Sequence, residues 1–155
     1  MLAWLLIGLL VQSAAAPSIT VSVEGGKTMT LSAADLAAMP QKTATASSHD
    51  QAGTYTGVPL RDILTKAGVP AGADIRGPVL ATSVVVTGAD GYRAVFAIAE
   101  IDPVFTDRVI LLASQKDGSP LPENARPFQV IVPGELRPAR WVRQVVSIAV
   151  QTARP

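Results

Sequence analysis

The fold of this chain depends most on residues 134–150, GELRPARWVRQVVSIAV. The second half of this stretch is a run of apolar and β-branched residues, a composition that favours a β-strand. The first half groups three arginines around one tryptophan, namely Arg137, Arg140, Trp141 and Arg143. We therefore predict a last strand over residues 141–150, preceded by a turn at Pro138 that carries concentrated positive charge.

The charge of the chain is balanced overall but uneven along its length. The 155 residues carry a formal net charge of +1. Residues 126–155 contain five arginines and one glutamate, a local charge of +4 that leaves −3 on the rest. Nucleic-acid-binding proteins spread basic residues over a whole face, often among aromatic side chains, and only 5% of this chain is aromatic. This distribution indicates a small anionic ligand and argues against nucleic acid.

The first sixteen residues, MLAWLLIGLLVQSAAA, have the pattern of an export signal. An apolar run too short to span a bilayer is followed by small residues, with Ala14 and Ala16 in an A-x-A arrangement. No lysine or arginine precedes the run, so an uncleaved anchor is the alternative. We expect residues 1–16 to be a signal peptide and residues 17–155 to form one domain in the bacterial periplasm or outside the cell, with no membrane span after cleavage.

The chain contains no cysteine. An exported domain without cysteine has no disulfides and must rely on its hydrophobic core for stability. It also offers no thiolate to a metal ion and no cysteine for lipidation. We therefore identify no metal ligand from the sequence.

The rest of the chain is predicted to be rich in strands, with a few short helices. Residues 18–23 alternate apolar and polar side chains as a half-buried strand does. Ser32 and Asp35 form a capping box at the start of a short helix. Further strands are expected over 41–47, 108–113 and 127–133, a polar loop over 48–53, a helix over 57–68 and a hairpin over 83–97. No repeat or linker divides these elements, so we predict a single sheet-rich mixed α+β domain.

The order of five motifs resembles the oxidoreductase molybdopterin-binding domain of the sulfite-oxidase superfamily. The motifs are YTGVPLRDIL at 55–64, VVVTGADGYRAVF at 84–96, VILLASQKDGSPL at 109–121, PFQVIVP at 127–133 and RPARWVRQVVSI at 137–148. The resemblance covers roughly residues 18–150. It implies a mixed fold of several sheets that holds molybdopterin, a pyranopterin whose dithiolene binds molybdenum. Catalytic members of the family oxidise or reduce small oxo-compounds such as sulfite or sulfoxides.

The resemblance implies a cofactor-binding role for the arginines of the last motif. Basic residues of that motif approach the pterin phosphate in the family, and Arg140 and Arg143 occupy their positions, with Arg137 nearby. A guanidinium presents a planar fork of donors that suits a phosphate. On a regular strand Arg140 and Arg143 point to opposite faces, so they converge only if the turn at Pro138 twists the chain. The alternative is that they are solvated charges beside a buried tryptophan.

The motif GADGYR supplies two further candidates. An Asp-Gly-Tyr run lies beside the metal in the family, which implies that Tyr92 donates a phenolic hydrogen bond to a metal-bound oxygen. Arg93 then places a positive charge beside an anionic substrate. The alternative is that Tyr92 shares a buried strand face with Ala94 and Phe96.

Two other segments have both a structural and a functional interpretation. His49 is the single histidine and lies in the polar loop that the family uses for its active site, so it is a candidate for cofactor contact or for an exposed position. The helix amino terminus expected near Gly57 and Val58 presents free N–H groups to an anion. Glu100 and Asp102 are expected to cap or solvate their turn and not to act as an acid/base pair.

The chain departs from the family at positions where catalytic members carry functional residues. Catalytic members coordinate molybdenum with a cysteine thiolate, and the corresponding region here is Ala46, Ser47 and Ser48. Ser47 is therefore, with Tyr92, a weak catalytic candidate. Gln129 stands where catalytic relatives often carry an arginine, and Pro138 stands where a glycine is common.

Three functions remain open at this stage. The first is an exported module that binds a pterin-type or other anionic ligand, or serves a redox system as an accessory with a redox partner protein. The second is a molybdenum-pterin oxidoreductase for sulfite- or sulfoxide-type compounds with an unusual ligand set. The third is an interaction scaffold without a ligand, so whether the chain is an enzyme is left undecided.

Overall fold

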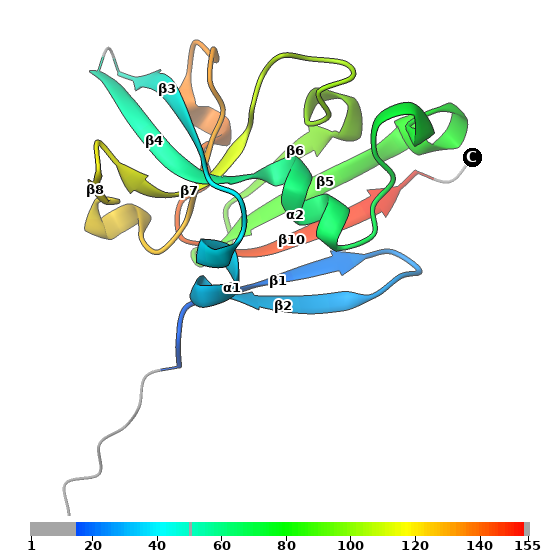
Figure 1. Ribbon diagram of the computed structural model, residues 1–155, viewed down its shortest axis with the longest axis horizontal. Coiled ribbons are helices and arrows are strands. Elements are labelled where there is room, and N and C mark those ends of the chain that lie inside the picture. The colour runs from blue at the N-terminus through cyan, green and yellow to red at the C-terminus, as the bar shows by residue number, and fades with distance from the viewer. Residues whose placement is uncertain (1–14, 50, 154–155) are drawn as a thin grey trace, which may run out of the picture.

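Two five-stranded sheets build the protein in a computed structural model that describes residues 15–49 and 51–153 (Figure 1). The first sheet has the order β2 (Thr28–Ser32), β1 (Ser18–Val23), β10 (Val145–Thr152), β5 (Thr82–Gly88), β6 (Arg93–Ala97). The second contains β3 (Lys42–Ser48), β4 (Gln51–Pro59), β7 (Leu111–Lys116) and β8 (Ser119–Pro120), with β9 (Gln129–Ile131) also paired to β7. The sheet-rich α+β prediction is confirmed.

Strand β10 holds the centre of the first sheet. It pairs in parallel with β1 and antiparallel with β5. Val145, Ile148 and Val150 point from it into the core and are almost fully buried. The strand begins at Val145, later than the predicted residue 141, because a 3-10 turn over Pro138–Arg140 and a positive φ of 49° at Gln144 interrupt the extended backbone first.

Both α-helices are short. In Figure 1 they lie in front of the two sheets and cover the core on that side. The capping box predicted for α1 (Ala33–Ala38) is present: the amide of Asp35 donates to Ser32 Oγ at 3.1 Å, and the amide of Ser32 donates to Asp35 Oδ2 at 2.9 Å. Hydrogen bonds from the hydroxyl and the amide of Ser32 lower the pKa of Asp35 below its usual value. Helix α2 (Leu60–Lys66) buries Leu60 and its apolar neighbours completely.

The predicted start of the second helix was wrong, and the anion site expected there is absent from the described residues. Gly57 and Val58 belong to strand β4, not to the helix. A Cβ on Gly57 would lie 2.2 Å from the Leu112 carbonyl oxygen, so only glycine allows β7 to approach this closely. The first helical amide, that of Leu60, donates to the Ile110 carbonyl at 2.8 Å.

Two other element boundaries differ from the prediction. The polar loop expected over residues 48–53 is mostly strand, because the Ser- and Thr-rich ends of β3 and β4 continue to pair as far as Ser48 and Gln51. The strand expected over 108–113 lies at Leu111–Lys116, where its polar end pairs with β4 at a partly exposed position. The remaining segments form short 3-10 turns at Gly72–Asp74, Gly77–Ala81, Ile98–Glu100, Glu123–Ala125 and Pro138–Arg140.

The export signal predicted for residues 1–16 lies almost wholly outside the described residues. Cleavage and export therefore stay predictions. Within residues 15–49 and 51–153, no helix has the length and apolar character needed to cross a membrane.

Candidate functional site

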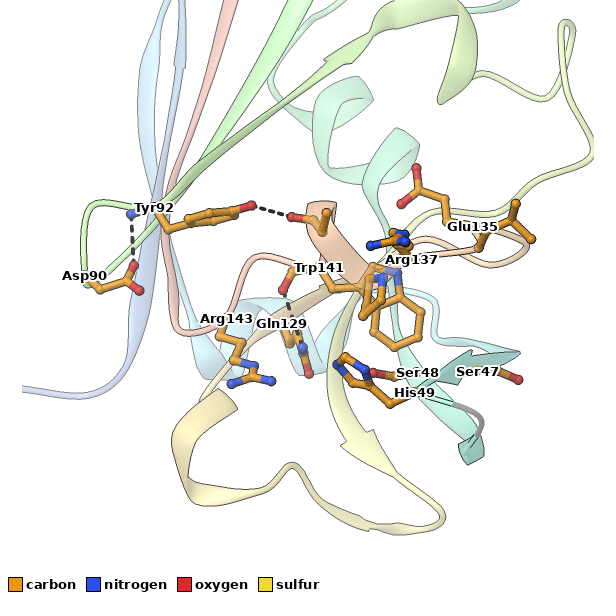
Figure 2. A pocket seen from close by; sticks show the side chains of 13 residues that line it. Ser47, Ser48, His49, Asp90, Tyr92, Gln129, Glu135, Arg137, Trp141 and Arg143 are labelled. Carbon is orange, nitrogen blue, oxygen red and sulfur yellow. Dashed lines mark hydrogen bonds between the residues drawn. The ribbon is translucent and has the colours of Figure 1, made fainter.

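A pocket of about 850 Å³ lies where loops from both sheets meet. Its lining comes from the β3–β4 turn, the β5–β6 hairpin, strand β9 and the segment 135–143 (Figure 2). Two of these four segments join strands that pair with each other, and the segment 135–143 connects β9 of the second sheet to β10 of the first. The sheets therefore fix the ends of the segments, while the polar side chains on them face the space between.

The floor of the pocket is Trp141. Its side chain is 6% exposed, and its indole Nε1 donates to the Val132 carbonyl at 3.3 Å. The ring meets Tyr55 edge-on, with centroids 5.6 Å apart. Gln129, which is also buried, points its amide nitrogen at the Trp141 carbonyl at 3.5 Å. Trp141 is thus buried, as the alternative interpretation of the motif requires, but only Arg137 and Arg143 of the three arginines are exposed, and Arg140 is half-buried.

Arg137 and Arg143 line the pocket. Both side chains are exposed, and neither makes an ion pair with any residue that the structure describes. Arg143 reaches the pocket because its segment packs tightly on the β5–β6 hairpin: a Cβ on Gly88 would lie 2.5 Å from the Arg143 carbonyl oxygen. Two guanidinium groups, each with its donors free of carboxylates, are thus presented to one space.

Arg140 is not part of this lining, although the resemblance implies that it binds the cofactor together with Arg143 and the nearby Arg137. It ends the 3-10 turn over Pro138–Arg140, and its guanidinium ion-pairs with Glu100 at 2.9 Å and with Glu135. It also lies over the ring of Phe96, 4.6 Å from the ring centroid. Burial lowers the pKa of Arg140, but the hydrogen bonds that its guanidinium donates to Glu135 and Glu100, together with their negative charges, outweigh burial and raise the pKa above its ordinary value.

Tyr92 lies at the pocket and is 51% exposed, so the alternative that it is a core residue was wrong. Its hydroxyl donates to the Ala139 carbonyl at 2.6 Å, and its amide donates to Asp90 Oδ1 at 2.9 Å (Figure 2). Arg93 is exposed and does not line the pocket, because consecutive residues on a strand point to opposite faces. Tyr92 therefore joins the site, whereas Arg93 does not.

Ser47, Ser48 and His49 line the pocket from the β3–β4 turn. His49 has a φ of 50°, a left-handed conformation that a tight hairpin turn requires here. A smaller recess of about 170 Å³ adjoins the pocket and shares Ser48, His49 and Arg143 with it. Lys116, which also lines this recess, extends over the Tyr55 ring at 5.7 Å from its centroid, and no feature of the sequence marked it.

The comparisons with known proteins identify the family and the fold. Residues 10–155 match the family model described as the oxidoreductase molybdopterin binding domain. The chain belongs to this family. No relative among curated proteins matches the sequence.

The chain shares its fold with a much longer protein, the sulfane dehydrogenase SoxCD from Paracoccus pantotrophus. The two superpose with a TM-score of 0.68 at 21% sequence identity. The match covers 86% of this chain and 37% of that one, so this domain spans little more than a third of the longer protein. At this identity the likeness concerns the fold alone.

The residues present fit one end of molybdopterin and not the other. A pocket of about 850 Å³ with two unpaired arginines suits a bulky ligand that carries a phosphate. The metal end lacks its usual protein donor, since the chain has no cysteine, and the described residues contain no group of three His, Cys, Asp or Glu side chains placed to hold a metal. Ser47, Ser48 and His49 supply only hydroxyl and imidazole donors there.

Proposed function

We propose that this domain is an exported module that binds a pterin-type cofactor by its anionic end and provides no thiolate ligand to molybdenum. The observation that carries the proposal is the pair Arg137 and Arg143, which face the pocket without a carboxylate partner among the described residues. The neighbouring Glu135 does not cancel them, because its carboxylate is engaged by Arg140. An accessory role beside a redox partner protein is consistent with this arrangement.

Each lining residue then has a role in binding. Arg137 and Arg143 hold the phosphate with charge-assisted hydrogen bonds, while the buried Trp141 gives the pocket a rigid apolar floor. Tyr92 closes one side and is itself held by the Ala139 carbonyl. When bound, molybdopterin supplies the dithiolene that carries the metal for the redox chemistry of the family.

The position of Ser47, Ser48 and His49 favours a second candidate function. All three line the same pocket as the two arginines, from the turn where the family carries its metal ligand. A deprotonated serine or the imidazole would then replace the thiolate in an oxidoreductase for small oxo-compounds. This candidate requires molybdenum to be held in the protein as well as pterin.

The first prediction concerns cofactor content in the arginine variants. We expect the full chain, purified from a molybdenum-replete bacterial host, to release pterin fluorescence on denaturation. The double variant R137Q/R143Q should bind pterin roughly 100-fold more weakly or worse, since two charge-assisted hydrogen bonds are lost. The charge-matched control R76Q/R93Q, which changes two exposed arginines outside the pocket, should retain wild-type pterin content.

The outcomes separate the two candidate functions. Wild-type protein without pterin, or R137Q/R143Q with as much pterin as the control, would refute binding at this pocket. Molybdenum measured by mass spectrometry at one atom per chain, and lost in S47A/S48A while pterin remains, would establish the second candidate in place of the first.

A further inference from the structure

We infer that Arg140 is a positioning residue that holds one wall of the pocket and does not itself contact the ligand. The inference rests on the proposed function for the identity of the ligand. It assigns to Arg140 a different role from that of Arg137 and Arg143, although the three belong to one short motif.

Arg140 joins three parts of the protein. Its Nε and Nη2 donate to Glu135 Oε1, the former at 2.8 Å. Its Nη1 donates to Glu100 Oε1 at 2.9 Å and to the Val95 carbonyl at 3.2 Å. Glu100 ends the 3-10 turn after β6, and Val95 lies on β6 itself, the edge strand of the first sheet. Arg140 therefore ties the segment before it to a sheet edge about forty residues away in sequence.

The segment that it ties has little else to hold it. Beyond the turn at Pro133 and Gly134, residues 133–137 make no backbone–backbone hydrogen bond with the residues that the structure describes. Leu136 is 102% exposed and contributes no packing, and Gly134 has a φ of 78°. The polar contact of this segment is the one between Glu135 and Arg140. Because Arg137 follows two residues later, the position of its guanidinium in the pocket depends on that contact.

The guanidinium geometry is essential to this role. Glu135, Glu100 and the Val95 carbonyl lie in different directions around one planar fork, and the fork also stacks on the Phe96 ring. A lysine has the charge but not the fixed fork, and cannot reach all three acceptors at once. An anion would also have to displace two carboxylates before it could bind Arg140. The structure thus separates the arginine that shapes the pocket from those that face it.

The test uses the full chain and two readouts. NMR relaxation of the backbone amides in the ligand-free protein reports on the order of residues 134–137, and pterin content reports on binding. We expect R140Q and R140K to lower the amide order parameters of this segment from about 0.85 to below about 0.6, with β10 unchanged, because one charge-assisted contact holds it. Pterin content should fall in both variants. R76Q, an exposed arginine outside the pocket, should change neither readout.

The variant E100Q/E135Q distinguishes positioning from direct contact. It leaves Arg140 charged and removes two negative charges near the pocket, so a ligand-contacting Arg140 should bind pterin as well as before or better. The positioning role instead predicts lower order parameters in residues 134–137 and reduced pterin. Wild-type order parameters in R140K, or undiminished pterin in E100Q/E135Q, would overturn the inference.

These outcomes are independent of the proposed function itself. If R137Q/R143Q retains pterin while R140K still loosens residues 134–137, the proposed ligand site fails and the positioning role of Arg140 stands. If R137Q/R143Q loses pterin while R140K leaves the order parameters of residues 134–137 unchanged, the proposed ligand site stands and the positioning role of Arg140 fails.

Discussion

Replacement of Asp102 by alanine is expected to lower the free energy of unfolding by about 3–5 kcal/mol, the usual cost of removing one partner of a buried ion pair. Asp102 is 1% exposed and Arg61 is 7% exposed, and their charged atoms lie 3.5 Å apart. The alanine variant leaves a buried guanidinium without this counter-charge. Urea denaturation followed by circular dichroism would measure the loss.

The hydrogen bonds of the two side chains explain why the expected effect is large. Asp102 accepts from the amides of Gly72 and Val104, both at 3.0 Å, so its removal also frees two backbone donors. Arg61 donates to the carbonyls of Val69 and Pro70 at 3.1 and 3.0 Å. Burial lowers the pKa of Arg61, and the charge of Asp102 partly restores it. Loss of Asp102 therefore removes the compensation and leaves the burial penalty.

A double variant provides the control. R61M/D102A removes the unpaired charge as well, so it should be more stable than the sum of the two single substitutions predicts. A loss below about 1 kcal/mol in D102A, or strict additivity in the double variant, would show that the pair contributes little.

Local sequence patterns predicted most of the fold because local interactions determine those elements. The alternation in residues 18–23 does bury Ile19 and Val21, and the Ser32–Asp35 capping box forms within four residues of chain. The boundaries that were wrong depend on pairing between distant strands. Gly57 belongs to a strand because β7 packs against its missing side chain, and nothing near it in sequence indicates that contact.

The candidate site was predictable in its segments but not in its side-chain assignments. The resemblance and the charge distribution placed His49, Tyr92, Arg137 and Arg143 near one another, and they do share one pocket. The different position of Arg140 follows from Glu100, forty residues earlier, which no local pattern connects to it. Asp102, expected to cap or solvate its turn, does cap it through the Val104 amide but is buried, because Arg61 lies beside it.

Trp141→Ala is expected to destabilise the protein by about 3–5 kcal/mol, as large-to-small substitution of a buried aromatic does. The indole loses its edge-on contact with Tyr55 and its hydrogen bond to Val132. Trp141→Phe keeps most of the ring packing and loses chiefly the N–H bond, so it should cost only about 0.5–1.5 kcal/mol. Urea denaturation of the two variants checks the order.

Urea denaturation of R143Q tests whether this arginine supports binding only, whereas Trp141, two residues earlier, supports folding. Arg143 is exposed and makes no ion pair with a described residue, so R143Q should change stability by less than about 0.5 kcal/mol. Its pterin content should nevertheless fall, whereas W141F should lose about 0.5–1.5 kcal/mol of stability and keep its pterin content. An R143Q variant as destabilised as W141A would mean that the arginine supports the fold. Of the motif's three arginines, Arg137 would then be the one left to bind a ligand, since Arg140 is already engaged within the protein.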